Sequence, residues 1–406
     1  MSEDDLRESA TATVRVEVAR GGATCAEIVT QVLELLESEA GDASKTGDAS
    51  NETPGEGQGD RAGRGDGVDL TALAWEVVAA EFAAHLEKQA GWPERTDSDR
   101  LTAAFHSLDA AGIVAREDFS CCQNCGVTEI RDETTDGASR GYVFYHGQDA
   151  LSAAEGLDIW LAYGGRDAEQ IAHEIVEALR AEGLTVQWDG TVGLRIHVTL
   201  RWARRRHGRM AAFPAPGDAT GPTATIRYSP GRNRLDPPMT AALLARLELP
   251  WLPAGVSVRV EEAGRVVTVH RERDTLIAHD GRRAGRFDGL RLLRGETVDV
   301  EGEPGLVEVG TDSSHPRPMD LPEMLDVLRR LPVRTSAHLT AAGEAGVVQM
   351  CWEEDRRLWL ETPRAADAAS IGKHATLDEA ERVLTILAVE HRNAVGELNG
   401  VITRPW

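Results

Sequence analysis

Three cysteines lie close together in the first half of the chain, and their residue type and spacing are the best suited to chemistry. Cys121, Cys122 and Cys125 occur in the stretch Ser-Cys-Cys-Gln-Asn-Cys-Gly. Cysteine thiolates bind soft metal ions such as zinc, and a Cys-x-x-Cys pair has the spacing of a zinc knuckle. His146, which ends the run Gly-Tyr-Val-Phe-Tyr-His, could supply a further ligand. These residues form a candidate zinc site.

Two other interpretations of the motif stay open. If Ser120 caps a helix, the three cysteines fall in its first turns, where backbone N–H groups and the helix dipole favour a thiolate. Cys122 and Cys125 could then form a thiol–disulfide couple, as in thioredoxin-like enzymes. The cysteines could instead be small packing residues. The sequence has no second Cys-x-x-Cys or paired histidines that would complete a zinc signature, so it does not decide between the three.

The segments that must position this motif predict an α+β fold. Apolar residues recur at helical spacing over residues 3–40 and 68–111, as in the face formed by Ile28, Val32 and Leu36. The pattern then changes to short β-prone runs. We expect a helical N-terminal region that leads into a mixed sheet with helices on one side, followed by a second, β-rich α+β domain.

Shifts in composition predict where the chain is divided. The expected units are an α+β domain at 1–206 with a disordered insertion at 41–67, a linker at 207–241, and a β-rich α+β domain at 242–406 that can be split into subdomains at 242–312 and 319–406. The insertion has almost no apolar residues to bury. The run Arg204-Arg205-Arg206-His207 could contact a phosphate, but we interpret it as a solvated strand end.

The net charge and the absence of known catalytic motifs disfavour several classes of function. A net charge of -23 disfavours nucleic-acid binding, because phosphates repel an acidic surface, and suits a basic protein partner. The sequence has no membrane-spanning apolar run and no secretory signal, so we expect a cytoplasmic protein. It has no Gly-x-x-x-x-Gly-Lys, Gly-x-Ser-x-Gly or His-Glu-x-x-His motif. We therefore expect a binding or interaction protein and not an enzyme; the alternative is a zinc or thiol-redox protein that uses the cysteines.

Several stretches resemble a bacterial domain family of unknown function. They are Asp109-Ala-Ala-Gly-Ile-Val-Ala-Arg-Glu-Asp-Phe-Ser-Cys-Cys-Gln-Asn-Cys-Gly, Gly141-Tyr-Val-Phe-Tyr-His, Leu161-Ala-Tyr-Gly and Leu184-Thr-Val-Gln-Trp-Asp-Gly. The resemblance covers residues 1–206 and implies that this half is one unit, but it implies no activity. The strand–helix order at the end of the chain resembles small bacterial immunity proteins by pattern alone.

Overall fold

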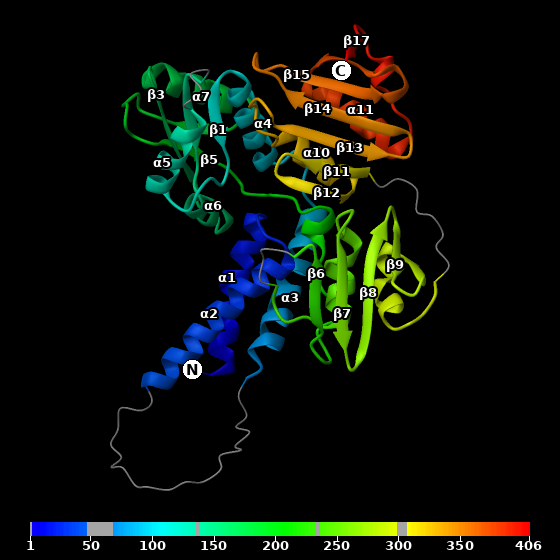
Figure 1. The fold of residues 1–406 in the computed structure, drawn as a ribbon. Coiled ribbons are helices and arrows are strands. Elements are labelled where there is room, and N and C mark those ends of the chain that lie inside the picture. Colours follow the sequence, from blue (N-terminus) through cyan, green and yellow to red (C-terminus); the bar gives the residue numbers. More distant parts are fainter. Residues whose placement is uncertain (1, 47–67, 135–138, 232–235, 299–306) are drawn as a thin grey trace.

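The structure is a computed structural model, and it describes residues 2–46, 68–134, 139–231, 236–298 and 307–406 (Figure 1). In these ranges helices make up the N-terminal part, and three sheets with further helices make up the remainder. This arrangement confirms the predicted α+β class. In the described part of the chain, none of the helices combines the length and the apolar character that crossing a bilayer requires.

Three helices pack together at the N-terminus: α1 (Glu3–Arg20), α2 (Cys25–Thr46) and α3 (Leu70–Ala90). Their apolar faces form one core, to which Val14, Ile28 and Phe82 contribute. Gly21 allows the tight turn from α1 into α2, because its φ of 80° lies in the left-handed region. The predicted insertion begins inside α2, and its residues 47–67 lie outside the described residues.

The first sheet lies directly after these helices. Its strand order is β1 (Ile113–Arg116), β2 (Gly141–Phe144), β3 (Ile159–Gly165), β5 (Ile196–Thr199) and β4 (Thr185–Gln187). β1 and β2 are parallel and the other pairs are antiparallel, so the predicted mixed sheet is confirmed. One face packs against α4 (Asp97–Ala110) and α7 (Ala168–Ala181). The short helix α6 (Gly147–Ala154) connects β2 to β3.

A further helix, α5 (Gln123–Glu133), packs on the opposite face of this sheet. Its Ile130 is buried against Val114 and Phe144. Gly126 permits the close approach, because a Cβ atom at this position would lie only 2.4 Å from Cε2 of Phe144. This contact fixes the first turn of α5, and with it the cysteine motif, against the sheet.

Two antiparallel sheets make up the C-terminal half. The second sheet has the order β10 (Arg283–Gly285), β9 (Thr275–Ala278), β8 (Arg265–Glu272), β7 (Ser257–Glu262) and β6 (Thr225–Ser229), with the helices α8 (Ala241–Leu247) and α9 (Gly289–Leu293). The third has the order β12 (Ser314–Met319), β11 (Val307–Thr311), β13 (His338–Gly343), β14 (Gly346–Trp352), β15 (Leu358–Arg364), β16 (Ala369–Ala375) and β17 (Ile402–Pro405), with the helices α10 (Leu321–Arg329) and α11 (Leu377–Val389).

The N-terminal helices pack directly on helix α8 of the second sheet. They also lie against β6 at the edge of that sheet, and Figure 1 shows α3 beside this strand. Leu243 of α8 belongs to the core of α1, α2 and α3, while Leu244 belongs to the core of the second sheet. Trp75 of α3 also donates a hydrogen bond of 2.9 Å to the Pro238 carbonyl. The strand β6 falls within the predicted linker at 207–241. The strand β11 falls within the predicted subdomain at 242–312, but it pairs with β13 of the third sheet. The predicted domain boundaries stay predictions.

The arginine run after the first sheet is not a solvated strand end, so this interpretation was wrong for two of its residues. Arg204 and Arg206 are 5% and 1% exposed. Arg206 donates to the carbonyls of Val18 at 2.9 Å and Ala23 at 2.8 Å, and its guanidinium carbon lies 4.6 Å from the ring centre of Phe82. Burial lowers the pKa of Arg206 to about 10. The run therefore anchors the chain segment that follows β5 to the end of α1 and to the α1–α2 turn.

Candidate metal centre at the cysteine motif

The segment between β1 and α5 bends sharply before it reaches the cysteines. Asp118 and Ser120 have φ values of 50° and 62°, in the left-handed region that residues other than glycine seldom adopt. Arg20, at the end of α1, donates two hydrogen bonds of 2.9 and 2.8 Å to the Asp118 carboxylate. The Phe119 N–H donates to the Tyr145 carbonyl at 2.9 Å. Contacts with two distant parts of the chain thus fix the shape of this segment.

The prediction that Ser120 caps the helix of the motif is wrong. α5 begins directly after Cys122, which takes the N-cap position. An N-cap residue has extended backbone, which the left-handed φ of Ser120 excludes. The Ser120 hydroxyl donates instead to Oε1 of Glu129 at 3.2 Å. Cys125 therefore lies inside the helix, whereas Cys121 and Cys122 precede it.

The three cysteine side chains nevertheless converge. Their Sγ atoms all lie within 4.8 Å of one another. Cys121, Cys122 and Cys125 carry free thiols and are each at least partly exposed. Two sulfurs on one tetrahedral zinc ion lie about 3.8 Å apart, because each Zn–S bond is about 2.3 Å long. Small side-chain rotations would therefore bring all three sulfurs onto a single ion.

The thiols differ in acidity because they hydrogen-bond one another. The backbone N–H of Cys125, followed by the thiols of Cys125 and Cys121, stabilises the Cys122 thiolate and lowers the pKa of Cys122. The thiols of Cys121 and Cys122 raise the pKa of Cys125 to about 11. Cys122 thus ionises before Cys125, and Cys125 needs a nearby positive charge, such as a metal ion, to lose its proton near neutral pH.

His146 lies outside the ligand group that the structure brings together at the motif. It caps α6: its Nδ1 accepts a hydrogen bond of 3.3 Å from the Asp149 N–H, and its Nε2 lies 3.2 Å from Oδ2 of Asp149. A neutral ring with its proton on Nε2 satisfies both contacts. Burial lowers the pKa of His146, with a smaller contribution in the same direction from Arg195. Within the described residues, the candidate metal ligands at the motif are the three cysteines.

Sequence reasoning missed a second group of potential ligands in the third sheet. Oxygen and nitrogen atoms of Glu353, Asp355 and His374 also lie within 4.8 Å of one another. His374 Nε2 is 2.6 Å from Glu353 Oε2, and Arg404 donates to Glu353 Oε1 at 2.7 Å. Arg357 donates to Asp355. Both carboxylates thus have basic partners already, and the charge of the group is balanced without a metal ion. Pairing of β15 with β16 brings the three residues together, so no local sequence signal indicates them.

Comparison with protein families matches residues 3–206 to a domain of unknown function, DUF6891. This match covers half of the chain and includes the N-terminal helices, the first sheet and the cysteine motif. The resemblance stated for residues 1–206 is thereby confirmed. No curated protein and no solved structure matches the chain.

Proposed function

Because the chain belongs to the DUF6891 family, whose description gives no function, we propose a function from geometry: Cys121, Cys122 and Cys125 bind a zinc ion. The observation that carries this proposal is the convergence of the three Sγ atoms within 4.8 Å at a partly exposed site. Three protein ligands leave the fourth tetrahedral position of zinc to a water molecule or to a side chain of a partner.

The hydrogen bonds among the thiols support an order of ligand binding. Cys122, the thiol with the lowered pKa, offers the first thiolate. The charge of the bound ion then favours ionisation of Cys125, whose pKa is raised to about 11 without it. Thiol protons are released as the metal binds, so zinc affinity should rise with pH.

Purified full-length protein should contain about one zinc ion per chain, bound through sulfur at about 2.3 Å in X-ray absorption spectra. The double variant Cys122→Ser/Cys125→Ser should lose this zinc, because it removes two of three ligands. Cys351→Ser is the matched control: this cysteine lies in β14, outside the motif, and its loss should leave zinc content unchanged. A native protein that contains no zinc and takes up none when it is added would refute the proposal.

A second candidate function is thiol–disulfide chemistry, which the unequal acidity of Cys122 and Cys125 supports. A thiol with a lowered pKa beside a second thiol is the arrangement of a nucleophilic and a resolving cysteine. Alkylation at neutral pH should then modify Cys122 faster than Cys125 or Cys351, and oxidation should give a reversible Cys122–Cys125 disulfide. Equal alkylation rates together with the absence of this disulfide would exclude the second candidate.

The excess of acidic residues supports a wider role as a binding protein for a basic protein partner, as an immunity protein would have. Such binding is steered by charge, so it should weaken as salt screens the interaction. Recovery of a basic partner from the native host in low salt, and its loss in high salt, is the test. Failure to recover any partner in low salt would count against this role.

A further inference from the structure

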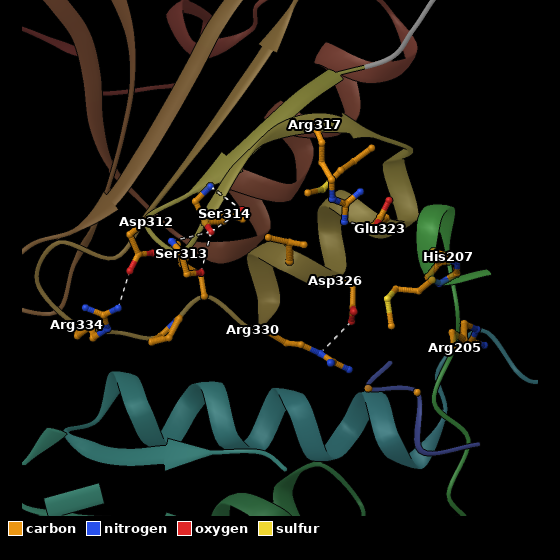
Figure 2. A pocket seen from close by; sticks show the side chains of 18 residues that line it. Arg205, His207, Asp312, Ser313, Ser314, Arg317, Glu323, Asp326, Arg330 and Arg334 are labelled. Atoms are coloured by element: carbon orange, nitrogen blue, oxygen red, sulfur yellow. Dashed lines mark hydrogen bonds and ion pairs between the residues drawn. The ribbon is translucent and has the colours of Figure 1, made fainter. Parts of the chain in front are cut away.

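A cavity of about 420 Å³ lies between the N-terminal half and the third sheet. The turn at Gly21 and Gly22, the segment that follows the family region, the β11–β12 turn and α10 all contribute to its lining (Figure 2). Cavities of this size hold small molecules, and ligand sites occur preferentially where two parts of a protein meet. The cavity is distinct from the cysteine motif, none of whose residues line it.

Arginines exceed carboxylates in the lining by four to three. The charged residues are Arg205, Arg317, Arg330 and Arg334 against Asp312, Glu323 and Asp326, and Arg205 is paired at 2.6 Å with Asp99, which lies outside the lining. Arg334 donates to Asp312 at 2.6 Å, and Arg317 donates to Glu323 at 2.6 Å. These ion pairs reduce the repulsion that the carboxylates would exert on an anion.

Two basic side chains of the lining keep hydrogen-bond donors that the protein does not use. Arg330 contacts Asp326 through Nε, which is 3.3 Å from Oδ1, and among the described residues its two Nη atoms make no hydrogen bond. Figure 2 shows this side chain extending below α10 into the open space. The side chain of His207, on the other side of the same cavity in Figure 2, also has no hydrogen-bond partner in the described ranges, whereas its backbone carbonyl accepts from the Met210 N–H.

The β11–β12 turn adds three hydroxyl groups to the same lining. Oγ1 of Thr311 lies 3.1 Å from Oγ of Ser313 and 2.9 Å from Oγ of Ser314. A hydroxyl group donates one proton while it accepts others, and it rotates to suit its surroundings. One of these protons can therefore turn toward a ligand oxygen without loss of the whole group of hydrogen bonds.

We propose that this cavity binds a small molecule through a phosphate or carboxylate group. The unused Nη donors of Arg330 match the oxygens of such a group, since a guanidinium binds an oxyanion with two parallel N–H bonds. His207 and the turn hydroxyls of Ser313 and Ser314 supply donors from other walls. These residues come from the third sheet and from the segment just after the family region, so the bound molecule links the two.

Calorimetric titration of the full chain with inorganic phosphate, pyrophosphate and citrate tests this proposal. At least one probe should bind, and comparison of the phosphates with citrate distinguishes a phosphate ligand from a carboxylate ligand. Arg330→Gln should weaken binding about tenfold or more, because it removes a charge-assisted pair of hydrogen bonds. His207→Gln should also weaken it. Arg382→Gln is the control: it removes the same charge from an exposed position on α11 and should leave affinity unchanged.

Each outcome of these titrations either supports or contradicts anion binding in the cavity. Absence of binding by all three anions at millimolar concentration would overturn the proposal, and so would an equal loss of affinity in the Arg382→Gln control. Circular dichroism establishes that Arg330→Gln folds like the unmodified chain. If that variant misfolds, His207→Gln decides: unchanged affinity in this variant would contradict the site.

Discussion

Replacing Arg206 with methionine should lower the free energy of unfolding by about 3 kcal/mol or more. The guanidinium is 1% exposed and donates to the carbonyls of Val18, Ala23 and Met210 at 2.9, 2.8 and 2.9 Å. Methionine fills much of the same volume but leaves these buried acceptors without a donor. A buried acceptor without a partner costs about 1–3 kcal/mol, and the substitution removes the donor from all three carbonyls at once.

Urea denaturation of the variant and the unmodified chain measures this effect. Arg201→Met is the matched control, because Arg201 belongs to the same segment but its side chain is exposed. The control should change stability by less than about 0.5 kcal/mol. A cost below about 1 kcal/mol for Arg206→Met would show that water or a shift of α1 satisfies the carbonyls, contrary to the tight packing of this site.

Helices were the part of the fold that local sequence predicted best. The spacing of Ile28, Val32 and Leu36 places them on one face of a helix, and all three are buried in α2. The change of period after Gly112 likewise predicted the start of the first sheet at Ile113. These properties depend on neighbouring residues alone, so no knowledge of distant contacts was required.

The error at Ser120 arose because distant contacts decide the local geometry there. Serine is a residue type that favours helix caps. At Ser120, however, the chain is bent, and the two hydrogen bonds from Arg20 to the Asp118 carboxylate fix this bend, so the helix begins later. For His146 a local signal existed: Asp149 three residues later completes a capping box, a pattern that is normally sought with serine or threonine. The cysteine convergence was predicted from spacing, while its ligand number needed the structure.

The anion-binding cavity could not have been predicted from the sequence. Its two unused donors, Arg330 and His207, are more than a hundred residues apart, and only the tertiary fold places α10 opposite the α1–α2 turn. The arginine run was misjudged for the same reason. The acceptors of Arg206 are backbone carbonyls, which exist at every residue and leave no signal in the sequence.

Acidification should destabilise the N-terminal helices through His85 on α3. The side chain is 8% exposed, and burial, followed by the positive charge of Arg206, lowers its pKa to about 4 from the ordinary value of 6.5. Between these two values the unfolded chain binds a proton that the folded chain does not. Stability must therefore fall as the pH drops from about 6.5 to about 4, and His85 adds no further loss below that. The shift corresponds to about 3 kcal/mol in total.

The variant His85→Gln should lose this part of the pH dependence. Its free energy of unfolding, compared with that of the unmodified chain from pH 7 to pH 4, should decline by about 3 kcal/mol less. Lost packing against Trp92, whose ring centre lies 5.3 Å from that of His85, adds an offset at every pH but no slope. His315→Gln, at an exposed position, should follow the unmodified chain. Parallel curves for His85→Gln and the unmodified chain would show that His85 becomes protonated without cost, and hence that α3 opens locally to water in acid.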